Sequence, residues 1–230
     1  LYAAYRSGCD EIKLLFDEEK VIDVNKKKKL FVIDVINSAV DNLIGIEIMV
    51  QKSNYVTLKE ISSVNREEFL NTLRRIFITL LNTSSDMKDA MEADNRVVLE
   101  RIKEISDKKI NRLCDFCFRI INKGGIVERA KIPQYYSIIS ILEEIGDSLE
   151  EVCELALKKK VDIKNVKMIN KLLDNLYRLF CEYKKQTLNE FYISKNNLRD
   201  ADVERDLKVE LSKIASSCSN IIPEIMSLNI

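Results

Sequence analysis

The chain has 230 residues, of which 46% are hydrophobic and 32% are charged, a mixture typical of a protein that folds around a substantial core. The 37 Lys and Arg residues balance the 37 Asp and Glu residues, and this zero net charge argues against a generally basic nucleic-acid-binding protein. His is absent from the sequence, which excludes His-based acid–base catalysis, His-containing triads and His-ligated zinc or di-iron sites.

Five Gly and two Pro residues are few for this length and favour long helices over a turn-rich β fold. We expect the six Cys residues to be reduced thiols of a cytoplasmic protein, since no signal peptide is recognisable. No apolar run reaches the roughly 20 residues that span a bilayer, so we do not expect an integral membrane protein. Because the chain begins at Leu1 rather than Met, we expect it to be part of a longer protein.

Residues 1–62 predict a small β-α-β-β module. Alternating apolar residues predict a strand at residues 12–16, and an apolar-rich helix is expected from about Lys26 to Asn42. Residues 46–58 alternate on both sides of a turn at residues 52–54, which predicts a hairpin whose inward residues are Ile46, Ile48, Val50, Val56 and Leu58. A second subunit could cover the free edge of such a sheet, and we therefore expect a homodimer.

From Asn65 onward the apolar spacing predicts helices. Asn65 and Glu68 form a capping-box pattern at the start of a helix over residues 66–92. A second helix, over residues 95–122, should be capped by Asp94 and end at two Gly residues. A third begins after Pro133, a fourth near Asp162, and a break near residues 194–197 leads to a fifth. The fold class is thus mainly α: an antiparallel bundle of five long helices, with a three-helix unit at residues 63–161 and a partial second unit at residues 162–230.

The third helix carries two regular rows of residues. Its apolar positions advance by three and four, the spacing of a seam packed against other helices: Tyr135, Ile138, Leu142, Ile145, Leu149, Val152 and Ala156. Glu143, Asp147, Glu150 and Glu154 form a row of carboxylates along the same helix. On the preceding helix Asp107, Asn111 and Asp115 have the same spacing.

If these two rows face each other, oxygen atoms from both helices converge. Oxygen donors without His suit a hard cation such as Mg²⁺, Ca²⁺ or Mn²⁺, or iron. The candidate ligands are Glu143, Asp147, Asp107 and Asn111. The alternative is a solvated acidic face, which any bundle in water displays.

Two stretches resemble the PhoU family of phosphate-uptake regulators. "LEEIGDSLEEVCELA" (residues 142–156) resembles the family's third-helix signature, and "ERIKEISDKKINRL" (residues 100–113) is similar to its second-helix pattern. Residues 8–61 resemble the linker module of archaeal PhoU-type proteins, which usually follows an AbrB-like DNA-binding domain. The resemblance covers residues 8 to about 215. Two positions depart from the family pattern: Glu144 replaces a basic residue, and Asn111 replaces the second acid of its pair.

The resemblance implies a PhoU-like fold, a multinuclear metal cluster on the acidic motifs, and a role in phosphate metabolism. The implied partners are a phosphate transporter or a sensor protein, and DNA only through a domain that this chain does not contain. We expect a non-enzymatic signalling or transcription-linked adaptor, because no nucleophile with a base, phosphate-cradling glycine loop or dinucleotide fingerprint is present. The alternatives are a metal-free scaffold for dimerisation and docking, and a carboxylate-bridged metal enzyme of ferritin type, against which the missing Glu-x-x-His motif argues.

Two further clusters have ordinary explanations. Cys114 and Cys117 form a C-x-x-C without further zinc ligands, and we expect them in the core. The lysines at residues 26–29 and 158–160 are expected on solvated faces, although the first group could contact the phosphates of nucleic acid or lipid.

Overall fold

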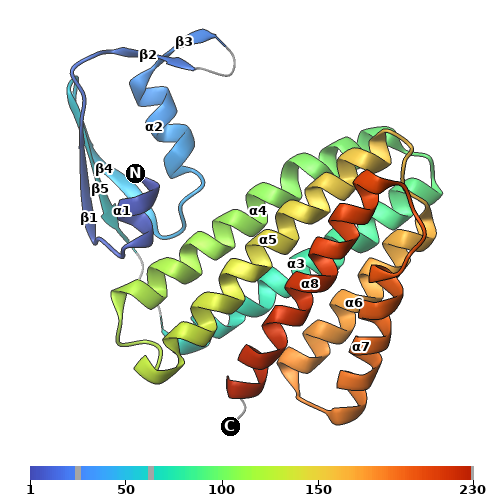
Figure 1. Cartoon of the computed structure of the whole chain (residues 1–230). Helices are drawn as coiled ribbons and strands as arrows, with labels where there is room; N and C mark the ends of the chain where they lie inside the picture. The colour runs from blue at the N-terminus through green and yellow to red at the C-terminus, as the bar shows by residue number, and fades with distance from the viewer. Residues whose placement is uncertain (24–26, 62–64, 229–230) are drawn as a thin grey trace. The chain divides into compact units, whose positions relative to one another are not determined.

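The structure is a computed structural model of the whole chain (Figure 1), and it describes residues 1–23, 27–61 and 65–228, with the side chains of residues 23 and 107 also outside the described part. About 70% of the chain is helical, and the described residues form eight α-helices, a three-stranded antiparallel sheet and a two-stranded ribbon. The prediction of a mainly α protein with a small β module near its start is confirmed.

The chain folds into two compact units. Unit 1 contains Leu1–Phe69 together with Asp115–Val127, and unit 2 contains Leu70–Cys114 together with Glu128–Ile230. Unit 1 is therefore discontinuous in sequence, because the last turns of a long helix belong to it.

The three-stranded sheet forms the centre of unit 1. Its strands are β1 (Glu11–Leu15), β5 (Tyr55–Glu60) and β4 (Ile46–Gln51), in the spatial order β1-β5-β4. The predicted strand near residue 12 and the hairpin around residues 52–54 are both confirmed. The short helices α1 (Tyr2–Arg6) and α2 (Val32–Val40) add to the core of the unit, whose buried side chains include Tyr5, Ile12, Ile36, Val40, Ile46, Val56 and Leu58.

A β-bulge interrupts the hairpin alternation in β4. Ile48 lies opposite Leu58, but Val50 lies opposite Thr57, so one extra residue is inserted between these pairs. The expectation that Val50 faces inward is wrong, since 37% of this residue is exposed. A strict two-residue period cannot anticipate the inserted residue.

The segment before α2 differs from the predicted helix. β2 (Lys20–Asp23) pairs antiparallel with β3 (Lys28–Phe31), and α2 begins only at Val32, whereas we expected a helix from about Lys26, a residue outside the described part. Leu30 lies opposite Val21 in this ribbon. Pairing between such apolar residues stabilises strands, and it outweighs the helical spacing of the apolar residues that follow.

Six helices follow the β module in the described part of the chain. They are α3 (Arg66–Glu92), α4 (Arg96–Lys123), α5 (Ile132–Leu157), α6 (Ile163–Cys181), α7 (Lys185–Arg199) and α8 (Arg205–Leu228). The first residues of α3 and the last turns of α4 belong to unit 1, and the rest of these six helices belongs to unit 2.

Local signals in the sequence set most of the helix ends. The capping box is confirmed: the Asn65 side chain accepts from the Glu68 amide at 2.9 Å, and the Glu68 carboxylate accepts from the Asn65 amide at 3.0 Å. The cap of α4 is Asn95 rather than Asp94, since Asn95 Oδ1 accepts from the Val98 amide at 3.1 Å. Gly124 ends α4 with a φ of +76°, a conformation that glycine adopts without strain.

The predicted apolar seam of α5 lies entirely in the core of unit 2, where each of its seven residues is at most 8% exposed. Within the same unit α5 packs along α8, and α3 meets α6 through the stacked rings of Phe77 and Phe180, 4.6 Å between centroids. The acids of α5 are consequently left on the remaining sides of the helix.

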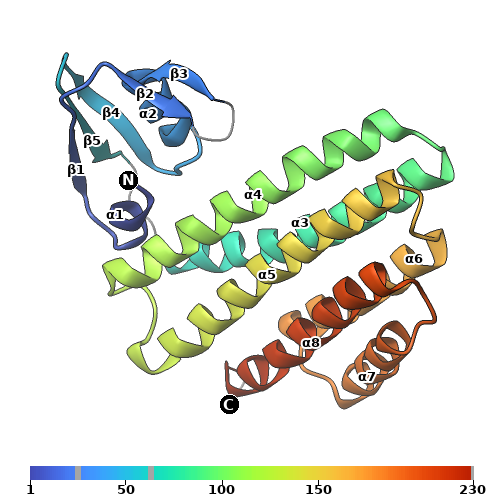
Figure 2. The same cartoon turned by 45° about the horizontal axis from the view of Figure 1, so that its top comes forward.

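The final segment contains one helix more than predicted. The break that we expected near residues 194–197 is wrong, because these residues lie inside α7, which packs against α6 and α8 (Figure 2). The breaks fall instead at residues 182–184 and 200–204. Thr187 and Ser194 occupy two inward positions of α7 and are at most 4% exposed, so its apolar pattern is incomplete.

Candidate functional site

The candidate site lies where α4 and α5 cross within unit 2. A Cβ atom added at Gly146 of α5 would stand 3.1 Å from Ile110 Cγ2 of α4, so the two backbones approach closely at this point. Toward the start of α4, the thiol of Cys153 donates to the Leu99 carbonyl at 3.6 Å. Residue numbers thus fall along α5 as they rise along α4, and the two helices are antiparallel.

This register places the two polar rows on the same side of the helix pair. On α4, positions 107 and 111 lie about 60° and 100° around the axis from Ile110 at 100° per residue. On α5, positions 143 and 147 lie at the same angles from Gly146. Because the helices are antiparallel, equal rotations from the contact point lead to the same side of the seam. The condition stated from the sequence, that the two rows face each other, is compatible with this register.

The predicted ligands differ in exposure. Glu143 is half-buried, Asp147 is exposed and Asn111 is half-buried, while Asp107 lies in α4 with its side chain outside the described part. Asp115, the third member of the α4 row, is only 6% exposed and forms an ion pair with Arg6 in unit 1. Asp115 therefore has a structural partner and does not extend the row.

A groove of about 530 Å³ continues along the same side of α4 and α5. Ion pairs cross it, since Lys103 of α4 contacts Glu154 of α5, which also binds Lys158 at 3.0 Å. These two lysines lower the pKa of Glu154 to about 2, and Glu154 raises the pKa of Lys103. The groove is lined by Arg96, Glu100, Lys103, Glu104, Lys108, Glu150, Glu154, Leu157 and Lys158.

The four predicted ligands all offer oxygen atoms, which fits a hard cation. The side chains that the structure describes nevertheless contain no group of three or more Asp, Glu or Cys close enough to hold a metal ion. A site at this crossing would thus depend on Asp107, whose carboxylate is the one predicted ligand outside the described part.

Glu144, one of the two residues that depart from the pattern of the family that the sequence resembles, lies on a different side of α5. Its Oε2 accepts a 3.4 Å hydrogen bond from Ser217 of α8. Around the axis it is about 160° from Gly146, away from positions 143 and 147. The Glu144 carboxylate therefore lies on the α5–α8 side of the helix and not on the α4–α5 side.

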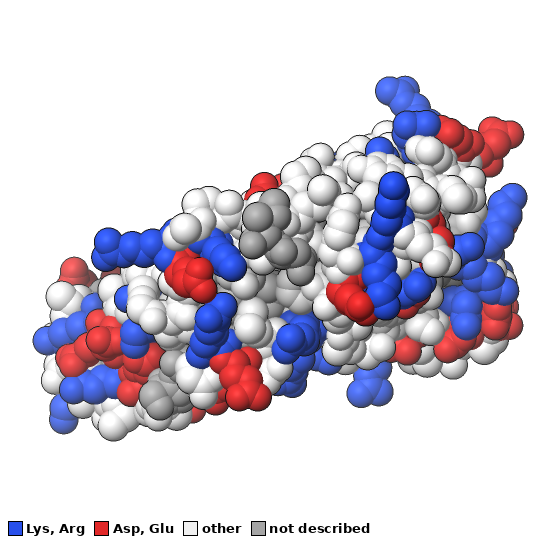
Figure 3. All heavy atoms as spheres, turned by 90° about the horizontal axis from the view of Figure 1, so that it is seen from below, with Lys and Arg blue, Asp and Glu red and all other residues white. Residues whose placement is uncertain are grey.

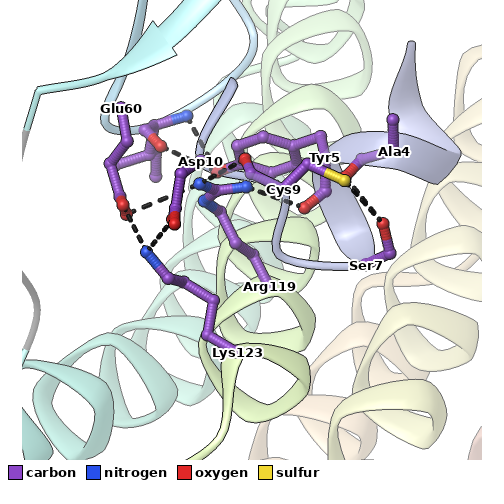
Figure 4. Close-up of polar contacts among 9 residues, drawn as sticks. Ala4, Tyr5, Ser7, Cys9, Asp10, Glu60, Arg119 and Lys123 are labelled. Atoms are coloured by element: carbon purple, nitrogen blue, oxygen red, sulfur yellow. Dashed lines mark hydrogen bonds and ion pairs between the residues drawn. The ribbon is translucent and has the colours of Figure 1, made fainter. Parts of the chain in front are cut away.

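Unit 1 contains a second polar cluster, which the sequence did not predict (Figure 4). Arg119, only 1% exposed, donates to the carbonyls of Tyr5 at 3.0 Å and Cys9 at 2.9 Å. Lys123 contacts Asp10 at 2.6 Å and also pairs with Glu60. Through these contacts Lys123 lowers the pKa of Asp10, and its own pKa is raised.

This cluster has a structural role. The guanidinium and ammonium groups are occupied by backbone carbonyls and carboxylates of the same unit, which leaves them satisfied within the fold. The partners come from residues 5–10 and from Glu60, more than 60 positions away along the chain. A pattern confined to one helix could not reveal them.

The C-x-x-C residues are core residues, as predicted. Cys114 and Cys117 are both 0% exposed, and burial raises the pKa of the Cys117 thiol. Burial also raises the pKa of Cys153, to about 11. Thiols held in this way are poor nucleophiles and poor metal ligands at neutral pH.

The surface shows no dominant sign of charge on the face drawn in Figure 3, where basic and acidic side chains lie beside one another. No helix in the described residues is long and apolar enough to cross a bilayer. Comparisons of the chain with protein-family models, with curated proteins and with solved structures give no match.

Proposed function

We propose that this chain is a non-enzymatic regulator of phosphate uptake of the PhoU type. It would act in the cytoplasm as an adaptor that conveys phosphate status to a transporter or a sensor protein. The observation that carries the proposal is the α4–α5 crossing, where Gly146 meets Ile110 and both polar rows emerge on one side. The two stretches that resemble the family lie on these same helices.

The order of the helices also supports the proposal. α3, α4 and α5 are followed by α6, α7 and α8, so the chain offers two successive sets of three helices rather than one and a part. This is compatible with a PhoU-like repeat, whose second copy we had expected to be incomplete.

A bound cation would be held by Glu143, Asp147, Asn111 and Asp107. It would supply a fixed positive charge for phosphate oxygens. Without it, the same acids would form a negatively charged docking surface beside the groove. In both cases the carboxylates at positions 143 and 147 carry the function, and no residue is required to transfer a proton or form a covalent bond.

The test replaces the gene in its source organism with the variant Glu143→Gln/Asp147→Asn and measures phosphate uptake at high and low external phosphate. We expect uptake to lose most of its dependence on external phosphate, as in a deletion strain. Glu144→Gln is the matched control, because it removes a neighbouring charge on a different side of α5. Uptake that responds normally in the double variant and in the deletion strain would refute the proposal.

Elemental analysis of the purified chain separates the two forms of the proposal. The metal-dependent form predicts about one or more equivalents of Mg, Ca, Mn or Fe per chain, lost in the double variant and kept in Glu144→Gln. The same uptake defect without any bound metal would assign the role to the carboxylates alone.

A second candidate function is a metal-free scaffold that dimerises through unit 1. It is favoured by β4, which has only β5 as a described neighbour and exposes 57% of Met49. Sedimentation equilibrium would reveal the dimer. Met49→Lys should raise its dissociation constant at least tenfold above that of the variant Lys52→Glu, which changes a residue in the adjacent turn. A monomeric chain would eliminate this candidate.

A further inference from the structure

The ribbon formed by β2, Lys27 and β3, hereafter the basic ribbon, is the most exposed structured part of unit 1. Every described side chain in it is exposed, and in the described residues β2 and β3 pair only with each other. A two-stranded ribbon is marginally stable by itself. Its exposed surface is therefore available to a partner that would stabilise it.

The ribbon combines positive charge with apolar side chains. Opposite residues of an antiparallel pair share a face, which puts Lys20 beside Phe31 and Ile22 beside Lys29. Ile22 is 65% exposed and Phe31 is 47% exposed, with the Lys20 ammonium 4.6 Å from the Phe31 ring centroid. One face thus presents two large apolar side chains flanked by two lysines.

The charge is concentrated at the turn. Lys27, Lys28 and Lys29 follow one another there, and the last two begin β3. Asp23 lies opposite Lys28 in the register, and the acids at residues 17–19 precede the other end of the ribbon. The ribbon therefore carries four described lysines, Lys20, Lys27, Lys28 and Lys29, while the neighbouring acids are Asp23 beside the turn and residues 17–19 before β2.

We propose that the basic ribbon binds the surface of an anionic lipid bilayer. Lysines near such a surface are attracted to its headgroups, and neighbouring apolar side chains enter the boundary between headgroups and acyl chains. The face that carries Ile22 and Phe31 would then lie against the bilayer, with Lys20 and Lys29 of the same face beside the headgroups. This inference is independent of the phosphate-uptake role and assigns the chain a peripheral membrane contact.

Nucleic acid fits the ribbon less well. Contacts with a phosphate backbone use cations and polar donors and have no use for an exposed Ile22.

The experiment is co-sedimentation of the full chain with sucrose-loaded vesicles of phosphatidylcholine alone or with about one-third phosphatidylserine. We expect binding only to the anionic vesicles, decreasing with added salt. Each lysine near the surface raises the binding constant for the vesicles about fivefold, so Lys27→Gln/Lys28→Gln/Lys29→Gln should weaken binding about a hundredfold. Ile22→Ser, which keeps every lysine, should weaken it by about tenfold or more.

The matched control is Lys158→Gln/Lys159→Gln/Lys160→Gln, which removes the same charge after α5, with circular dichroism confirming that each variant is folded. Binding should be little changed in this control. Equal losses in the two triple variants, no effect of Ile22→Ser, or no binding to anionic vesicles would overturn the proposal. Binding to a DNA or RNA duplex but not to vesicles would also overturn it.

Discussion

The close approach at Gly146 can be tested by a double-mutant cycle with Ile110. Alanine at position 146 gains about 1 kcal/mol over glycine in an α-helix. In the native chain, however, its Cβ would lie 3.1 Å from Ile110 Cγ2 and 3.2 Å from Ile110 Cδ1. Overpacking of this kind costs about 1–3 kcal/mol. We expect Gly146→Ala to lower the free energy of unfolding by about 1 kcal/mol.

Removing the Ile110 side chain should reverse the sign of that effect. Ile110 is 1% exposed, and Ile110→Ala by itself should cost about 2–5 kcal/mol through the cavity that it leaves. In that background Gly146→Ala meets no obstacle and should stabilise the chain by about 1 kcal/mol. The two residues should therefore couple by about 2 kcal/mol.

Urea unfolding followed by circular dichroism measures all four proteins, with unchanged m values required for the comparison. Gly146→Ala that stabilises both backgrounds by the same amount would show zero coupling. That result would mean that α4 and α5 do not meet at this point, and the derived position of the two polar rows would be refuted.

Three further predictions concern other parts of the chain. The pKa of Glu154 is lowered to about 2 in the folded chain from 4.5, so its contribution to stability is present above pH 4.5 and is lost as the pH falls toward 2. Glu154→Gln should therefore make the unfolding midpoint less dependent on pH between 4.5 and 2. Arg119→Met leaves the carbonyls of Tyr5 and Cys9 without their donor and should cost about 3 kcal/mol, with faster amide exchange in the first ten residues but not in α7. Iodoacetamide at pH 8 should alkylate Cys9 and Cys181 within minutes, and only urea should expose the remaining thiols, Cys114, Cys117, Cys153 and Cys218.

The helices could be predicted where every inward position carries an apolar side chain. The α5 seam is apolar at each of its seven positions, from Tyr135 to Ala156, and its buried face is as expected. α7 has Thr187 and Ser194 at two of its four inward positions, and the Ser194 hydroxyl donates to the Glu190 carbonyl one turn earlier. Small hydroxylated side chains satisfy themselves in this way inside a helix, so an apolar period alone misses them.

The helix face shared by the candidate ligands could be predicted for the same reason, whereas the contacts around it could not. Acids four positions apart must share a helix face, whereas Asp115 is withdrawn from its row by Arg6, 109 positions away. Likewise, the pairing of β2 with β3 overrides a helical spacing through contacts with the opposite strand. Such effects depend on tertiary partners that a single segment does not reveal.

The Arg119–Lys123 cluster has a consequence for synthesis on the ribosome. Unit 1 requires side chains from α4 to hold its first ten residues, so the amino-terminal β module cannot reach its final state until more than half of the chain has been translated. At about 5–20 residues per second this delay lasts several seconds. During that interval the first ten residues of the nascent module lack these contacts and remain accessible to chaperones or to a neighbouring chain.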